Sequence, residues 1–487
     1  MKNFIKNILA ISMLVAVTSA CQDDFVDRDP VYSIDSENYF NNEDEYYNAL
    51  VAAYDLLQST YVNQLLGEIA SDNTLCGGES ATDVIGYQQV DDMIHTPINN
   101  DLRNIWNFMF AGVNRASYIL EFQDKTDFEG KEVILAEAKF LRAYYNFELV
   151  KWFGPIPIKV DQRFALDDEK SIPRSPVSEV YAFIESDLQY AIANLSYDAP
   201  QVGRATKGSA QALLGKVYLY QEKFNEAATT LESLITSGPY DLVADYDDLF
   251  EESGENGVES VFEVQYTDVE GAGFGCLQCS EGNVAVGFSG IRNYSGPLFS
   301  SGFSFNVPTA EAYAAFESGD IRRDVAILDI VAWANQTGAT YGEGFEHTGY
   351  FNRKYIPRIR SANAAQDLNL TNPNNYRAIR FADVLLMAAE ALNRGGISDA
   401  RAQTYLNRVR QRAQLSDVAF TGSNLTEAIY QERRVELVGE GHRFFDLVRI
   451  GRGTVIDGFT PNKHELFPVP LEEIEFSNGN WDQNPGY

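Results

Sequence analysis

Apolar residues recur at every third or fourth position along most of the chain, which is the spacing of one helix face. In residues 43–59 this pattern follows a cluster of acidic residues that suits the start of a helix. The same spacing predicts helices over 101–121, 131–152 and 176–194, and the Phe-Gly-Pro after residue 152 marks a helix end. The sequence therefore predicts a mostly α-helical protein.

Residues 206–239 match a helix-turn-helix repeat of the tetratricopeptide type, in which a small residue of one helix faces a small residue of the next. Ala388 and Ala400 repeat the twelve-residue offset between the two small residues. We therefore expect a tetratricopeptide-type helical array with units near 131–239 and 376–450. The matching positions of the first repeat are Gly215, Tyr218, Phe224, Ala227 and Pro239.

Three segments interrupt the helical pattern. Residues 71–97 are small and polar, 254–308 are rich in glycine and aromatic residues with short strand-like pieces, and 332–349 form a second glycine-rich insertion. Long loops in a compact protein are either functional or disordered, and the aromatic content argues against disorder. We expect the three insertions to form a loop-rich, short-strand ligand-binding region.

Residues 431–451 carry four acidic residues and four arginines between apolar residues, so their formal charge is zero in a chain whose net charge is −32. Such balance predicts a partly buried ion-pair network that clamps two helices, split by Gly439 and Gly441. The alternative interpretation of the same charges is an active site. The charged residues are Glu432, Arg433, Arg434, Glu436, Glu440, Arg443, Asp446 and Arg449.

The N-terminus predicts export and a lipid anchor. Lys2 and Lys6 precede a short apolar run at 8–17 that is too short to span a bilayer, as in a secretory signal peptide. Cys21 follows Ser-Ala, as in bacterial lipoproteins whose cysteine is acylated; plain secretion with a chance cysteine is the alternative. We therefore expect a signal peptide over 1–20, a lipid-anchored tether over 21–42 and one domain over 43–487.

The acidic composition excludes one class of partner. The formal net charge of −32 argues against nucleic acid, because proteins that bind nucleic acid are basic. It also argues against docking on an anionic lipid surface through charge. We expect neither type of partner, and attachment to the membrane would be through lipid alone.

The cysteines of the second insertion predict a local disulfide between Cys276 and Cys279. Their CxxC spacing also occurs in redox and zinc sites, but there is no second CxxC and no histidine near the pair in the sequence. A bond from Cys76 to one of them is a further alternative. We expect no metal site and no cofactor.

Five motifs together resemble the SusD/RagB family of surface nutrient-binding lipoproteins. They are AEAKFLRAYYNFELVKWFGPIPI, GDIRRD, RFADVLLMAAEAL, ERRVELVGEGHRFFDLVRIG and LFPVPLEEI followed by QNPGY. The resemblance implies a tetratricopeptide scaffold with a loop region. It also implies that the protein lies at the cell surface on the outer membrane, captures an oligosaccharide and delivers it to a TonB-dependent, SusC-like barrel. The family has peptide-binding members, so a peptide ligand is the alternative.

Sugar recognition needs flat aromatic faces together with amide, carboxylate or arginine side chains, placed in loops. Trp106, Trp152 and Trp481 are expected in the core. The candidate ligand-binding residues are Asp72, Asp83 and Tyr87 in the first insertion, Phe274, Arg292 and Tyr294 in the second, Trp333 in the third, and Arg360 and Tyr376 beside it. A neutral glycan is favoured, since an acidic one would need an arginine cluster.

No catalytic residues are predicted. The chain lacks Gly-x-Ser-x-Gly, His-Glu-x-x-His and a phosphate-binding Gly-Lys-Ser/Thr loop. A glycoside hydrolase, which needs only two suitably spaced carboxylates, and a tetratricopeptide adaptor with protein partners are the less favoured alternatives.

Overall fold

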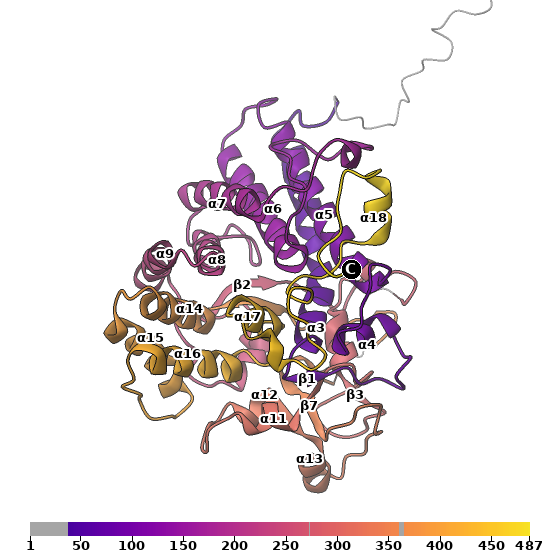
Figure 1. Cartoon of the computed structure of the whole chain (residues 1–487), viewed down its shortest axis with the longest axis vertical. Coiled ribbons are helices and arrows are strands. Elements are labelled where there is room, and N and C mark those ends of the chain that lie inside the picture. Colours follow the sequence, from indigo (N-terminus) through magenta and orange to yellow (C-terminus); the bar gives the residue numbers. More distant parts are fainter. Residues whose placement is uncertain (1–37, 272, 360–364) are drawn as a thin grey trace, which may run out of the picture.

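The computed structural model describes residues 38–271, 273–359 and 365–487 (Figure 1). The predicted signal peptide, Cys21 and Arg360 therefore lie outside the described residues. Within the described ranges, no helix is both long enough and apolar enough to cross a membrane.

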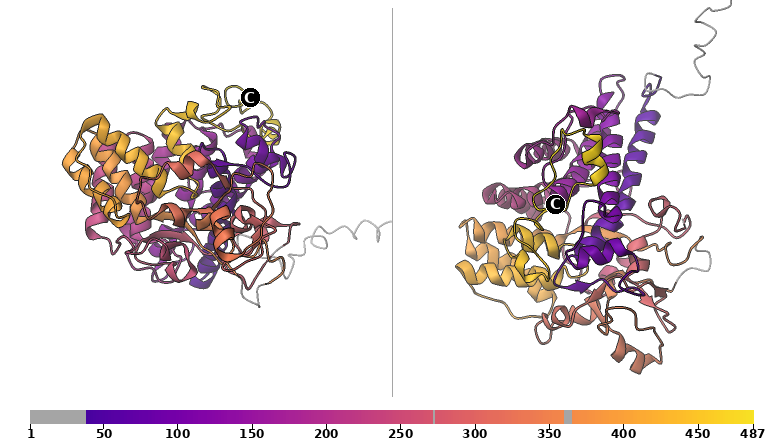
Figure 2. Two further views of the ribbon diagram at one scale, coloured as in Figure 1. Left: turned by 90° about the horizontal axis from the view of Figure 1, so that it is seen from below. Right: turned by 45° about the vertical axis from the view of Figure 1, so that its right-hand side comes forward.

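The long helices form one continuous array, as the sequence predicts (Figures 1 and 2). In chain order, each of the helices α5 to α9 packs on the next, and α14 then packs on α9, α15 and α16. The array thus continues across the mid-chain loops. These helices are α2 (Glu43–Asp55), α5 (Asn100–Glu121), α6 (Lys131–Phe153), α7 (Val177–Asn194), α8 (Lys207–Tyr220), α9 (Phe224–Ser237), α14 (Phe381–Arg394), α15 (Asp399–Arg412) and α16 (Gly422–Glu436).

The tetratricopeptide spacing has a steric cause in the α8–α9 pair. A Cβ atom added at Gly215 of α8 would lie 2.3 Å from the Leu231 side chain of α9, so the close approach requires glycine. Ala227, the small residue on the facing helix, is fully buried. The mostly α-helical, tetratricopeptide-type fold predicted from the sequence is confirmed.

Short strands and helices form most of the chain between α9 and α14 and also occur before α5 and after α16. The strands pair two by two: β1 with β5, β2 with β8 and β6 with β7 are antiparallel, and β3 with β4 is parallel. The strands are β1 (Thr74–Leu75), β2 (Ser260–Val264), β3 (Ile291–Arg292), β4 (Ser301–Gly302), β5 (Val307–Pro308), β6 (Ile327–Asp329), β7 (Tyr350–Asn352) and β8 (Tyr376–Arg380). The short helices are α3 (Tyr61–Ile69), α4 (Ile85–Asp91), α10 (Val284–Ser289), α11 (Ala310–Ala314), α12 (Arg323–Ala326), α13 (Ile330–Thr337), α17 (Arg443–Arg449) and α18 (Leu471–Phe476).

Each of the three predicted loops contains part or all of a helix, and α10 is the one within 254–308. Within 71–97 the structure has α4, in which Tyr87 and Val90, three positions apart, are both buried. The start of the 332–349 insertion belongs to α13, whose N-terminus is capped by the Asp329 side chain accepting from the amide of Ala332 at 2.9 Å. Helices this short have too few turns to show the three- to four-residue spacing of apolar residues in the sequence.

The charges of 431–451 form a buried ion-pair network, as the sequence predicts. Arg380, at the end of β8, donates to the Glu436 and Glu440 carboxylates at 2.7–2.8 Å and to Glu259 at 2.7 Å. Burial alone would raise the pKa of Glu436, but the charges of Arg412 and Arg380 outweigh it and hold that pKa far below its usual value. The cluster joins five cations, Arg322, Lys354, Arg380, Arg410 and Arg412, to the buried carboxylates Glu259, Asp320, Glu432, Glu436 and Glu440 and to the more exposed Glu317.

The predicted split at the two glycines is confirmed, since α16 ends at Glu436 and α17 begins at Arg443. Gly439 and Gly441 have φ of 82° and 81°, which favours glycine. Their amides donate to the two oxygens of the Glu68 carboxylate at 2.9 and 3.0 Å. Glu68 of α3 is fully buried, so the glycine turn ties the C-terminal motif to the N-terminal helices.

We predict that Arg380→Ala destabilises the protein by about 3–5 kcal/mol, because it leaves buried carboxylates without their partner. Urea unfolding of the form that lacks residues 1–21 measures the effect. The matched control is Arg452→Ala. Arg452 and its partner Glu427 have side chains that are 42% and 56% exposed, so this loss should cost about 1 kcal/mol or less. Equal effects of the two substitutions would contradict a buried network.

Candidate functional site

The three insertions interlock into one surface, which we call the loop face and define as residues 71–97, 254–308 and 332–349. Gly78 donates its amide to the carbonyl of Ser304 and accepts from the amide of Phe345, both at 2.9 Å. The amide of Gly342 donates to the carbonyl of Arg292 at 2.8 Å. Backbone hydrogen bonds therefore join segments that are far apart in the sequence, with α13 at the end of the molecule (Figure 1).

Three candidate residues meet at one part of the loop face. The guanidinium of Arg292 lies 3.5 Å from the carboxylate of Asp83 and donates to the carbonyl of Phe303 at 2.9 Å. The ring of Phe303 packs edge-on against Phe274, with 5.8 Å between the centroids. Phe274 is 59% exposed, so this ring is available to a ligand.

A second aromatic cluster on the loop face contains Trp333 and Tyr294. The indole nitrogen of Trp333 donates to the hydroxyl of Tyr294 at 2.9 Å, and that hydroxyl donates to the carbonyl of Pro297 at 2.7 Å. The Trp333 ring also lies 5.4 Å from the ring of Phe299. Trp333 is half-buried and held on α13 by these contacts, whereas Tyr294 is buried beneath it.

Two candidates support the scaffold. Arg443 donates to both oxygens of Asp72 at 2.7 and 2.9 Å, and Arg434 lies 3.3 Å away. Burial alone would raise the pKa of the Asp72 carboxyl, but Arg443 and Arg434 hold it below its usual range. Tyr376 of β8 is buried and donates its hydroxyl to the carbonyl of Glu440 at 3.1 Å. Both side chains therefore serve the ion-pair motif.

Tyr87 was expected to contact ligand but is 2% exposed. Its ring lies 5.9 Å from Phe288 and 5.8 Å from Phe305, beneath the loop face. Burial raises the pKa of its hydroxyl well above the usual value. Since Tyr87 is the one aromatic residue of the first insertion, that insertion contributes a packing anchor in place of a stacking surface.

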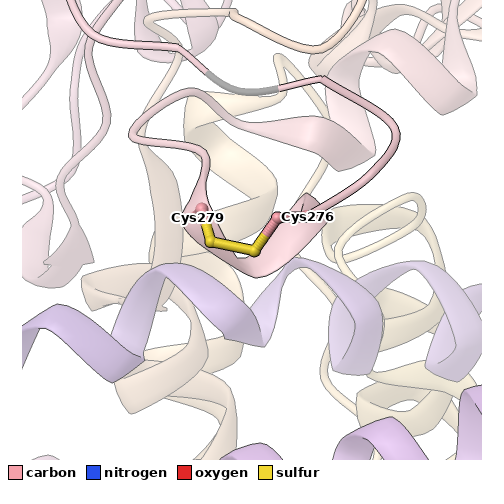
Figure 3. Close-up of a disulfide and its surroundings, with 2 residues drawn as sticks. All are labelled: Cys276 and Cys279. Carbon is pink, nitrogen blue, oxygen red and sulfur yellow. A yellow bond between two sulfur atoms is a disulfide. The ribbon is translucent and has the colours of Figure 1, made fainter.

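The Cys276–Cys279 disulfide closes a short turn that begins just after Phe274 in the sequence (Figure 3). The same segment is held to the N-terminal helices, because the amide of Gln58 donates to the carboxylate of Glu281 at 2.5 Å. Cys76 is a buried free thiol. The described residues contain no group of His, Cys, Asp or Glu side chains able to hold a metal ion.

Sequence reasoning missed one exposed pair. The rings of Tyr341 and His347 lie 5.6 Å apart in the third insertion, and both are half-exposed. The available signal is the presence of two further aromatic residues in the same glycine-rich insertion as Trp333.

Comparison with known proteins identifies the family. The SusD family model matches residues 328–487, and a second model, described as starch-binding associating with outer membrane, matches residues 24–219. SusD-like protein P2 of Formosa agariphila is 30% identical over 73% of this chain and 74% of its own length. The chain belongs to the SusD family. The expected family membership is thereby confirmed.

Solved structures of the SusD family have the same fold. A laminarin binding SusD-like protein superposes with a TM-score of 0.85 and 36% identity over 92% of this chain and all of its own. Surface glycan-binding protein A from Bacteroides thetaiotaomicron, solved in complex with laminarihexaose, gives a TM-score of 0.80 and 26% identity over 91% and 99%. These SusD-like relatives are glycan-binding proteins without enzymatic activity, which agrees with the clamp interpretation of residues 431–451.

We predict that Tyr87→Ala lowers the free energy of unfolding by about 3 kcal/mol or more, because it empties a buried aromatic site. The matched control is Phe274→Ala on the same face, which removes an exposed ring and should change stability by about 0.5 kcal/mol or less. Thermal or urea unfolding distinguishes the two. A Tyr87→Ala protein of unchanged stability would show that the ring is not the packing anchor described above.

Proposed function

We propose that this protein is a cell-surface lipoprotein that binds a neutral glycan of the laminarin type through the loop face. It then delivers the glycan to a TonB-dependent, SusC-like barrel in the outer membrane. The observation that carries the proposal is the 36% identity to a laminarin binding SusD-like protein over the whole of that protein. The protein in complex with laminarihexaose supports an oligosaccharide as the ligand.

The charges of the loop face support a neutral ligand. The sequences of the three insertions contain a single basic residue of the lysine or arginine type, which is Arg292. Its guanidinium is already engaged by the Asp83 carboxylate and the Phe303 carbonyl. The charge of Arg292 is therefore already balanced by Asp83, so a sulfated or uronic glycan would find no uncompensated cation there. The Nε donor of Arg292 has no partner in the structure, so it can still bind a hydroxyl group of a neutral sugar.

The aromatic rings of the loop face supply the apolar half of sugar recognition. Phe274 is exposed and packs against Phe303 just before the disulfide-closed turn, and Trp333 is fixed by its hydrogen bond to Tyr294. Rigid rings lose little conformational entropy when a sugar stacks on them. We assign Phe274 and Trp333 as stacking residues, Asp83 and Arg292 as partners for hydroxyl groups, and Tyr294 as the residue that positions Trp333.

We predict that Phe274→Ala and Trp333→Ala each weaken laminarihexaose binding about five- to tenfold, because each removes apolar contact with the sugar ring. Isothermal titration with the form that lacks residues 1–21 measures the affinities. The matched control is Phe420→Ala, which removes a 48% exposed ring away from the loop face and should leave affinity unchanged.

Three outcomes would overturn parts of this proposal. Unchanged affinity in both loop-face variants would remove the assigned site. Heat with peptides and none with laminarihexaose or other neutral glycans would favour a peptide ligand. Release of shorter sugars during the titration would show hydrolysis in place of reversible binding.

The anchoring step rests on Cys21, which follows Ser-Ala at the end of the apolar run. We predict that Cys21→Ala moves the protein from the membrane fraction to the soluble fraction and abolishes labelling by radioactive palmitate. Glycan affinity should stay unchanged, since residue 21 precedes the folded domain. Continued membrane attachment of the variant would contradict a lipid anchor at this residue.

Co-purification of the wild-type protein with an outer-membrane barrel tests the delivery step.

A further inference from the structure

A cavity of about 360 Å³ lies between α5, α18 and the segment that follows α6, far from α13 (Figure 1). Its volume falls in the range of small-ligand sites. Residues from three separate parts of the sequence line it, and none belongs to the insertions that form the loop face. We call it the aromatic cavity.

Four aromatic side chains border the aromatic cavity: Trp106, Phe110, Phe164 and Trp481. The ring of Trp106 lies 4.7 Å from Phe110 and 6.0 Å from Trp481, and Phe110 meets Phe164 edge-on at 5.8 Å. Trp106 and Trp481 are 2% and 6% exposed, so they are core residues as predicted, but they also form a wall of this cavity. Phe110 and Phe164 are half-exposed.

Carboxylates give the aromatic cavity its charge. Asp168 is paired with Lys159 at 2.7 Å, but Glu169 and Glu473 also line the cavity. Among the described residues, neither of these two carboxylates has a basic side chain within 4 Å. The nearby Arg103 donates to Glu472 at 2.8 Å. The cavity therefore combines aromatic rings with two carboxylates that form no close ion pair among the described residues.

The environment of Glu473 is unfavourable for its ionised form. Burial raises its pKa first of all, and the negative charges of Glu169 and Glu472 raise it further. The attraction of Arg103 and a hydrogen bond from the Trp106 side chain lower it, but they do not outweigh the other causes. A cation bound in the cavity would relieve this repulsion. It would also be attracted to the faces of the aromatic rings, whose quadrupole is negative there. A neutral sugar would not reduce the repulsion between the carboxylates, and an anion would be repelled by them.

We propose that the aromatic cavity binds the cationic side chain of a lysine or arginine presented by a partner polypeptide. The surroundings favour a polypeptide over a free small cation, because large apolar side chains are exposed beside the lining residues. Leu166 is 91% exposed two residues from Phe164, and Phe476 is 58% exposed three residues from Glu473. Exposed apolar side chains around a pocket are typical of surfaces that contact another chain. This inference does not depend on the proposed glycan function.

The probe is the blocked peptide Ac-Ala-Lys-Ala-NH2, titrated into the form that lacks residues 1–21. Two of the four tryptophans border the cavity, so tryptophan fluorescence reports binding. Two control peptides carry acetyl-lysine or norleucine at the central position. Both keep an apolar chain and lack the charge, and we expect them to bind at least about tenfold more weakly than the lysine peptide.

Glu473→Gln should weaken binding of the lysine peptide about tenfold, because it removes one carboxylate without changing the shape of the side chain. The matched control is Glu475→Gln, on the same helix but exposed and not in contact with the cavity, which should leave binding within about twofold. If Glu473→Gln fails to fold, Phe164→Ala provides the second variant and should also weaken binding. Laminarihexaose affinity should be unchanged in all of these variants.

The proposal is overturned if the norleucine peptide binds as tightly as the lysine peptide, or if Glu473→Gln and Phe164→Ala leave binding unchanged. It is also overturned if laminarihexaose displaces the lysine peptide, since the cavity would then be a sugar site. Free choline that binds as tightly as the lysine peptide would overturn the polypeptide as the source of the cation. Failure of laminarihexaose to bind at the loop face would affect only the proposed function.

Discussion

The guanidinium of Arg380 connects the parts of this protein. It is 1% exposed and donates to three carboxylates from two parts of the sequence: Glu259 just before β2, and Glu436 and Glu440 at and just after the end of α16. Arg380 itself lies between β8 and α14. One side chain thus joins the mid-chain insertion, the helical array and the C-terminal motif. An arginine suits this position because all of its donors are satisfied by fixed, planar acceptors.

This junction explains how a helical repeat carries a large insertion. The array does not end at α9, because α14 packs directly on it. The intervening chain is anchored where β2 pairs with β8, next to Arg380, and elsewhere forms short two-stranded ladders. Recognition loops can therefore differ in length and composition while the junction stays the same. Such a division suits a binding protein, since rigid support lowers the entropic cost of holding loop residues for a ligand.

Much of the scaffold was predictable from the sequence because its signals are local and repeated. Helical spacing gave α2, α5, α6 and α7, and the offset between Gly215 and Ala227 identified the tetratricopeptide unit. Balanced charge at 431–451 indicated burial, since an exposed helix would share the acidic bias of the chain. The pattern could not identify the partners of these charges. Arg380, Lys354 and Glu68 contact this motif from segments far away in the sequence.

The ligand site was less predictable, because exposure in a loop depends on long-range packing. Tyr87 and Phe274 are both aromatic residues of insertions, yet Tyr87 lies beneath Phe288 and Phe305 whereas Phe274 lies on the surface above Phe303. Residue type and spacing do not distinguish these two situations. Asp72 shows the same ambiguity for charge, since only the fold reveals that Arg443 already occupies both of its oxygens. The family can therefore be identified from scaffold residues that form ion pairs and hydrogen bonds with one another. The ligand depends on exposed residues that remain available to it, and the sequence alone does not show which residues these are.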